Sequence, residues 1–140
     1  MKLAIIGDRE CINYDIVCLA VKESGFQDIT EIVSGGARGA DRLALLYADE
    51  HKLKYTEFPA KWNDLKAKNS VIKVNQWGNK YNSNAGLVRD AALVLYSDAL
   101  VAIQDRGPTP GTQYTIKLAK KKNIPVYVYE KQTKDYEYQF

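Results

Sequence analysis

The feature that most limits how this chain can fold is a cluster of three glycines, at positions 35, 36 and 39. An apolar run at residues 29–33 comes directly before the cluster, and apolar side chains recur at helical spacing after it. Glycine permits the tight, left-handed backbone that such a junction needs. The pattern therefore predicts a buried strand that turns on glycines and opens a helix over residues 39 to about 52.

A turn of this kind is a candidate anion-binding site. The first N–H groups of a helix point outward, and the helix dipole adds partial positive charge there. Arg38 adds a planar guanidinium that suits phosphate. Asp41 would hold that arginine, accept a ribose hydroxyl or complement the helix dipole. The structural alternative is a plain glycine-rich turn with a solvated arginine, and we expect the phosphate site.

Apolar runs and helical stripes alternate along the whole chain. Strands are predicted at residues 3–6, 29–33, 53–58, 100–103 and 126–129. Helices are predicted between them, one ending before Gly25, one beginning at the N-cap Asn84 and one ending in three lysines at 120–122. This alternation predicts an α/β fold, a Rossmann-like, doubly wound and mainly parallel five-stranded sheet with helices on both faces. Such sheets bind ligands at the carboxyl ends of their strands, where the strand order reverses.

Three loops follow predicted strands and should meet at that edge: residues 7–10, the glycine cluster and residues 105–112. Arg89 is one turn inside its helix, so it should reach the same place. Arg9, Arg38 and Arg89 would then converge, and arginine recognises phosphate in a bidentate way. The predicted ligand-binding residues are Gly7, Asp8, Arg9, Ser34, Gly35, Gly36, Ala37, Arg38, Gly39, Asp41, Arg89, Gly111 and Thr112.

Several of these candidates have structural alternatives. Gly111 and Thr112 open a helix and offer a second anion site, although a threonine there equally suits an N-cap. Asp8 follows a strand and is placed to act as a base or to accept a hydroxyl. His51 is expected on the surface and Cys18 in the core. The single histidine and the two cysteines form neither a catalytic triad nor a set of zinc ligands, so we expect neither a metal nor a cofactor.

The length of 140 residues fits one domain at 1–129, with an insertion at about 64–80 and a tail at 130–140. The whole connection at 59–83 carries five lysines and two tryptophans, and connections this long are often lids or mobile insertions. The tail has alternating aromatic residues that could add an edge strand or pack on a partner subunit.

Charge and composition narrow the expected partners. A net charge of +3 suits an anionic small molecule and falls short of the basic footprint of a duplex-DNA binder. No apolar run approaches the ~20 residues that span a bilayer. Two cysteines give no disulfide framework, which predicts the cytoplasm. We therefore expect a nucleotide-derived small molecule as partner, and neither nucleic acid nor a membrane.

Four motifs together resemble the SLOG superfamily, which is named for its Smf/DNA-processing and Lonely Guy branches. They are Gly-Asp-Arg after the first strand, the block at 34–44, Ala-Gly-Leu-Val-Arg at 85–89 and Gly-Thr at 111–112. With Phe-Pro-Ala-Lys-Trp at 58–62, the chain is most similar to the YspA-like branch of bacterial and phage proteins.

The resemblance covers most of residues 2–129. It implies a Rossmann-like fold, a nucleotide or nucleotide-derived signal as ligand, and a homo-oligomer (dimer or higher) in a bacterium or a phage-infected cell.

The departures from this pattern bear on function. Lonely Guy enzymes remove the base of a nucleoside monophosphate with an arginine and a glutamate, and Thr115 stands at the position of that glutamate. Threonine cannot replace a carboxylate in such a reaction. Asp90, where YspA-like relatives usually carry asparagine, could supply an acid instead.

Three functions follow. A sensor or sequestering protein for a phosphorylated nucleoside is favoured over a nucleoside 5′-monophosphate phosphoribohydrolase with Arg89 and Asp90 or Asp8. Single-stranded DNA binding through lysines and aromatic residues of segment 61–81 is the third.

Overall fold

The computed structural model describes residues 1–9, 11 and 13–130. Its strands are β1 (Lys2–Gly7), β2 (Glu31–Ser34), β3 (Lys54–Glu57), β4 (Ile72–Val74), β5 (Lys80–Asn82), β6 (Ala99–Gln104) and β7 (Val126–Glu130). Its helices are α1 (Tyr14–Ser24), α2 (Ala40–Glu50), α3 (Ala85–Tyr96) and α4 (Pro110–Lys122). Of the predicted tail, residues 131–140 lie outside the described residues.

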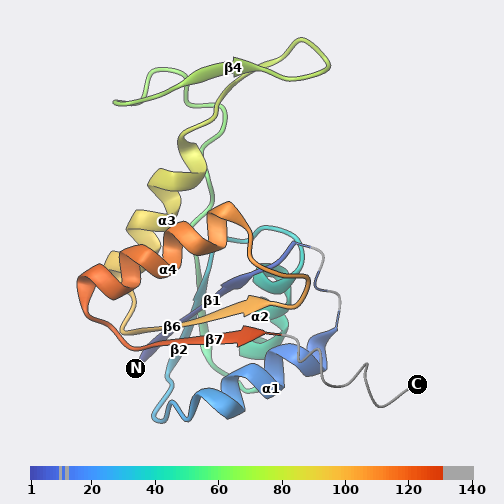
Figure 1. Cartoon of the computed structure of the whole chain (residues 1–140), viewed down its shortest axis with the longest axis vertical. Helices are drawn as coiled ribbons and strands as arrows, with labels where there is room; N and C mark the ends of the chain where they lie inside the picture. The colour runs from blue at the N-terminus through green and yellow to red at the C-terminus, as the bar shows by residue number, and fades with distance from the viewer. Residues whose placement is uncertain (10, 12, 131–140) are drawn as a thin grey trace.

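Five strands form one parallel sheet in the order β3-β2-β1-β6-β7. Strand β1 is central, and Leu3 lies opposite Ile32 of β2 on one side and Ala99 of β6 on the other. The chain runs outward from β1 to β3, then returns to the middle and runs outward again through β6 and β7 (Figure 1). The predicted doubly wound α/β sheet is confirmed, with its order reversing between β1 and β6.

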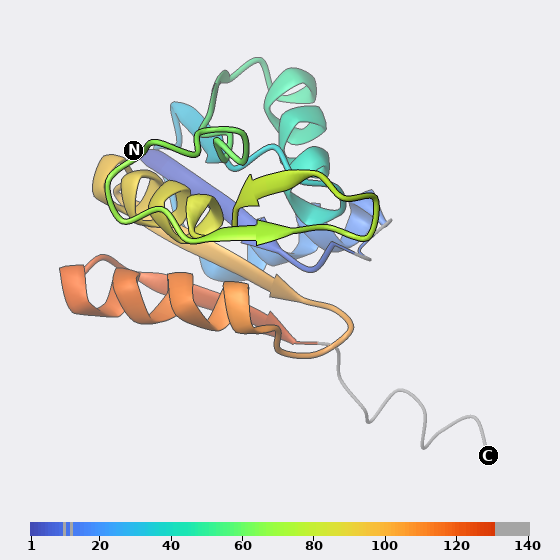
Figure 2. The ribbon, with the colours of Figure 1, turned by 90° about the horizontal axis from the view of Figure 1, so that it is seen from above.

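Helices cover both faces of the sheet, and each face has its own core (Figures 1 and 2). Leu3 and Ile5 pack on the side of α1 and α2, whereas Ala4 and Ile6 pack on the side of α3 and α4. Consecutive strand residues point to opposite faces, so a strand buried on both faces reads as one unbroken apolar run. Each fully buried Leu or Ile contributes about 2 kcal/mol of transfer free energy.

The helix ends show which local signals acted as expected. Gly25 closes α1 in the left-handed conformation, with φ 72°. Asn84 precedes α3, as predicted, but its side chain makes no capping hydrogen bond; its amide donates to the carbonyl of Asn69 instead, at 3.0 Å. Asn84 therefore occupies the predicted N-cap position, but its side chain does not cap the helix, because a tertiary contact engages it.

Two further expectations need correction. The second strand begins at residue 31 rather than 29, since Glu31 is the first residue of β2 in register with β1 and β3. Cys18 is half-buried at the rim of the core, whereas Cys11 is the buried cysteine. His51 is exposed, as predicted, and stacks on Tyr47.

The connection at 59–83 contains an antiparallel hairpin of β4 and β5 that the sequence reading did not include. The hairpin stands off the sheet beyond the start of α3, at the top of Figure 1. Asn82 anchors it: its side chain accepts from the N–H groups of Val71 and Asn84, and its own N–H donates to the Trp62 carbonyl at 2.7 Å. The predicted insertion thus has regular structure, fixed to the start of α3 through one buried asparagine.

No helix among the described residues is both long enough and apolar enough to cross a bilayer.

Candidate functional site

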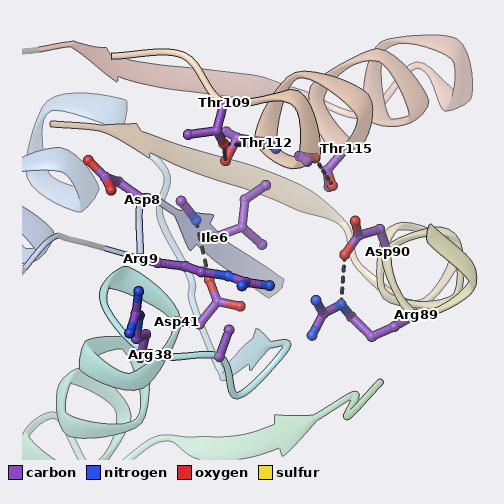
Figure 3. A pocket seen from close by; sticks show the side chains of 13 residues that line it. Ile6, Asp8, Arg9, Arg38, Asp41, Arg89, Asp90, Thr109, Thr112 and Thr115 are labelled. Atoms are coloured by element: carbon purple, nitrogen blue, oxygen red, sulfur yellow. Dashed lines mark hydrogen bonds and ion pairs between the residues drawn. The ribbon is translucent and has the colours of Figure 1, made fainter. Parts of the chain in front are cut away.

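A pocket of about 360 Å³ lies at the carboxyl edge of the sheet, where the order reverses between β1 and β6 (Figure 3). It is lined by Ile6, Gly7, Asp8, Arg9, Ala37, Arg38, Asp41, Arg89, Asp90, Thr109, Gly111, Thr112 and Thr115. Parallel strands with helices on both faces leave their crevice at this place because the flanking helices diverge there. Each of the three predicted loops, together with helix α3, which carries Arg89, forms part of the pocket wall.

Nine predicted residues line this pocket: Gly7, Asp8, Arg9, Ala37, Arg38, Asp41, Arg89, Gly111 and Thr112. The other four lie behind it. Ser34 is fully buried and donates to the Asp41 carbonyl at 3.1 Å, so it supports the turn from below. Gly35, Gly36 and Gly39 shape the turn without lining the pocket.

Two of these glycines are needed for close approach. A Cβ on Gly35 would collide with the Arg89 guanidinium and the Asp41 carboxylate. A Cβ on Gly39, which has φ 80°, would collide with the backbone of Asp8 and Arg9. The glycine turn is therefore pressed against the first loop on one side and against Arg89 on the other.

The glycine turn has fewer free N–H groups than its sequence suggests. The Gly36 N–H donates to the Ser34 hydroxyl, and the Ala40 N–H donates to the Asp8 carbonyl at 3.1 Å. Ala37, two residues before the N-cap of α2, and Gly111, in the first turn of α4, both line the pocket. The backbone N–H groups at the start of a helix are where an anion binds best.

The start of α4 combines capping with pocket lining. Thr109 is its N-cap and accepts from the Thr112 N–H at 3.4 Å. The capping alternative is therefore confirmed, with Thr109 as the cap, and the capped turn also lines the pocket, whereas anion binding there stays a prediction. The Thr109 hydroxyl donates to that of Thr112 at 3.0 Å (Figure 3).

Asp8 ties two of the loops together. Its carboxylate accepts from the Arg106 N–H at 2.7 Å, and its carbonyl accepts from Ala40 and Cys11. The side chain is 4% exposed. A carboxylate engaged with a backbone N–H in this way positions the loop after β6, so its first role is to fix the shape of the pocket.

Asp41 lies at the floor of the pocket in the first turn of α2. It accepts from the Gly7 N–H at 3.2 Å, which joins α2 to the end of β1. Burial raises the pKa of Asp41 to about 7, against the opposing effects of the Arg89 charge and the N–H groups of Gly7 and Gly35. This carboxyl group therefore exchanges its proton near neutral pH.

Arg89 and Asp90 both face the pocket from α3 (Figure 3). The Arg89 Nε donates to the Asp90 Oδ1 at 2.7 Å, and the Arg89 Nη1 donates to the Gly35 carbonyl at 2.9 Å. The two side chains are 11% and 14% exposed. Burial raises the pKa of Asp90 although the Arg89 charge lowers it. Thr115 of α4 lies opposite this carboxyl group.

Arg89 also separates the pocket from a second cavity. That cavity has a volume of about 410 Å³ and lies between residues 57–68 and α3, with Phe58, Pro59 and Val88 among its apolar lining. Arg89 lines both spaces, so its contact with Gly35 forms a partition between them.

Four lining residues were not among the predicted site residues: Ile6, Asp90, Thr109 and Thr115. Ile6 lines the pocket because it lies near the end of β1, and Thr109 lines it because it is the N-cap of α4. Asp90 had been weighed as an acid, but consecutive helical positions differ by about 100°, so sequence alone does not show that both it and Arg89 turn inward. No group of three or more metal-ligating His, Cys, Asp or Glu side chains occurs in the described part of the chain.

The fold and the position of the pocket define a Rossmann-like α/β protein. Its pocket lies at the carboxyl edge of the sheet, where the strand order reverses. Residues 1–64 match the model of the YspA, cpYpsA-related SLOG family. This match confirms the resemblance to the SLOG superfamily and its YspA-like branch.

Among solved structures, the chain is similar to DNA processing protein A (DprA) from Streptococcus pneumoniae, with a TM-score of 0.66 and 16% identity. The alignment covers 96% of this chain and 52% of that one, so the chain spans about half the length of DprA. At this identity the likeness shows the shared fold. No curated protein matches the chain.

Proposed function

We propose that the chain binds a phosphorylated nucleoside or nucleotide-derived signalling molecule in the pocket at the carboxyl edge of the sheet. The observation that carries this proposal is the convergence of Arg9, Arg38 and Arg89 with the starts of α2 and α4 on one pocket. The match of residues 1–64 to a SLOG family model supports the same class of ligand, because the resemblance to this superfamily implies a nucleotide or nucleotide-derived signal.

The acids of the pocket refine the class of ligand. Asp41, with a pKa raised by burial to about 7, opposes an incoming anion less than an ordinary carboxylate would, and the negative charge of Asp90 is paired with Arg89. Their oxygens still accept hydrogen bonds from sugar hydroxyls. Phosphate-binding and hydroxyl-accepting groups in one space fit a sugar phosphate better than a free inorganic anion. The protein then acts as a sensor or a sequestering protein.

A thermal-shift screen of AMP, ADP-ribose and cyclic nucleotides tests the proposal. The melting temperature should rise with at least one of them, since a ligand that binds only the folded state stabilises it. Arg38→Ala should abolish the rise, whereas Arg42→Ala, in the first turn of α2 just after this loop but outside the pocket, should keep it. Equal shifts in both variants would place the ligand elsewhere.

A second function, hydrolysis of the N-glycosidic bond of a nucleoside 5′-monophosphate, is favoured by one observation. Asp90 faces the pocket beside Arg89 and opposite Thr115, the position of the acid in Lonely Guy enzymes. Asp90 would assist water in attacking C1′ while the bond to the base breaks and the base leaves with a proton. Incubation with AMP should then release adenine and ribose 5-phosphate. Asp90→Asn should stop the release and preserve AMP binding; recovery of intact AMP from the native protein would leave binding as the function.

A further inference from the structure

The hairpin and its flanks at residues 61–81, called here the basic hairpin, account for the net positive charge of the chain. Five lysines and one aspartate give this segment a net charge of +4. The chain carries +3 in total, so the remaining residues together carry −1. All five lysines are exposed. The segment stands away from the sheet in Figure 1.

Large apolar and aromatic side chains are exposed on the same segment. Trp77 at the turn is 75% exposed, Val74 is 60% exposed and Trp62 is 39% exposed. A hollow of about 700 Å³ follows β5 and is lined by Trp62, Asn63, Asn75, Asn79, Lys80 and Tyr81. Aromatic rings, amide groups and a lysine are the groups with which proteins hold unpaired bases and their phosphates.

The register of the hairpin mixes lysines with apolar residues on each face. Val74 lies opposite Lys80, and Lys73 lies opposite Tyr81. Directly opposed residues of an antiparallel pair point to the same face, so each face presents a lysine beside an apolar or aromatic side chain. A membrane-surface element would place its apolar residues on one face and its charges on the other. Lysines placed beside apolar or aromatic side chains instead suit a single strand of nucleic acid, in which phosphates and bases alternate.

We propose that the basic hairpin binds single-stranded nucleic acid. The lysines contact phosphates, Trp62, Trp77 and Tyr81 stack on bases, and the asparagine amides in the hollow contact base edges. From the sequence alone, single-stranded DNA binding by this segment stands third among three functions, because the net charge is averaged over 140 residues. The structure gathers that charge on one projecting element.

This site is separate from the nucleotide pocket. No residue of 61–81 lines that pocket. The two proposals therefore fail independently: loss of ADP-ribose binding leaves the hairpin intact, and loss of oligonucleotide binding leaves the pocket intact.

Fluorescence anisotropy of a labelled oligothymidine with the full chain tests the proposal. Binding should be saturable at low salt and should weaken as salt rises. Trp77→Ala should weaken binding by roughly tenfold, the effect of removing one stacking contact. The double variant Lys73→Gln/Lys80→Gln should weaken binding and reduce the slope of log affinity against log salt by about 1.4, since each phosphate contact on a single strand contributes about 0.7.

The matched control is Lys120→Gln/Lys121→Gln, two exposed lysines at the end of α4. It removes the same charge and should bind the oligonucleotide as the native chain does. Equal losses in both double variants would show a nonspecific charge effect and overturn the site. Competition by duplex DNA as strong as that by the single strand would overturn the stacking argument. Binding to anionic lipid vesicles without oligonucleotide binding would replace the proposal with a membrane contact.

Discussion

Arg89 and Asp90 are consecutive residues of α3, and the Nε of one donates to the Oδ1 of the other at 2.7 Å inside the pocket. The same guanidinium holds the Gly35 carbonyl at 2.9 Å. One side chain therefore connects the glycine turn, the acid of α3 and, through its charge, Asp41.

Arg89→Gln tests this central role. The change removes the charge that lowers the pKa values of Asp41 and Asp90, so both should rise further. Loss of one partner of a buried pair costs several kcal/mol, and we expect the unfolding free energy to fall by roughly 3 kcal/mol. Urea denaturation measures this, and the thermal shift given by any nucleotide that stabilises the native chain should be lost as well. Arg42→Gln is the control; an equal effect there would remove the special role of Arg89.

Gly35→Ala tests the close approach between the turn and α3. The added Cβ would occupy the space of the Arg89 guanidinium, so the arginine should move and ligand binding should fall at least tenfold. Calorimetric titration measures the affinity. Gly25→Ala is the control for stability, because it costs about 1 kcal/mol at a left-handed position far from the pocket. If Gly25→Ala weakened binding as much as Gly35→Ala, the effect would reflect general destabilisation.

Asp41→Asn should change how stability depends on pH. Asp41 has a pKa of about 7 in the folded chain and an ordinary value near 3.8 when unfolded. Between these pH values the folded state binds a proton that the unfolded state lacks, so the stability contributed by this group is lost as pH rises from about 4 to 7. The unfolding free energy of the variant, relative to the native chain, should therefore increase over this range.

Urea titrations at several pH values measure that difference. Asp49→Asn, an exposed position on the same helix, should give a difference that stays constant with pH. A constant difference for Asp41→Asn as well would contradict the raised pKa.

Lys122→Met should destabilise the junction of α3 and α4. The Lys122 Nζ donates to three carbonyls at the end of α3: Val94 at 2.9 Å, Leu95 at 2.6 Å and Ser97 at 3.1 Å. The last carbonyls of a helix have no i+4 donor within the helix. Of these three, the Val94 carbonyl also accepts from the Ser97 N–H at 3.3 Å, and the Lys122 ammonium group adds a charged donor to all three. We expect a loss of roughly 1 to 2 kcal/mol in thermal or urea unfolding. Lys121→Met, at the exposed neighbouring position, should cost less than about 0.5 kcal/mol.

Much of the fold could be predicted because local patterns and tertiary packing agree. The apolar runs of β1 and β6 are buried on both faces, and Gly25 and Thr109 sit at helix ends as their chemistry favours. Asn84 shows the limit: its amide binds Asn69, a contact that local propensity does not contain.

The hairpin and the inward direction of Asp90 were missed for related reasons. Strands of three residues, such as Ile72–Val74, give too short an alternation to recognise. Asp90 faces the pocket because α4 places Thr115 opposite it, which depends on how two helices pack. The arginines were found because each follows a strand or begins a helix, and the topology alone then brings them together.

The reversal of strand order between β1 and β6 divides the pocket between two stretches of chain that fold on opposite sides of the centre. Lining residues between positions 6 and 41 form one wall, and lining residues between positions 89 and 115 form the other. The family match at 1–64 covers the first wall and ends before the second. Substitutions in α3 and α4 can therefore change the shape and charge of the second wall while the arginine turn of the first wall stays unchanged.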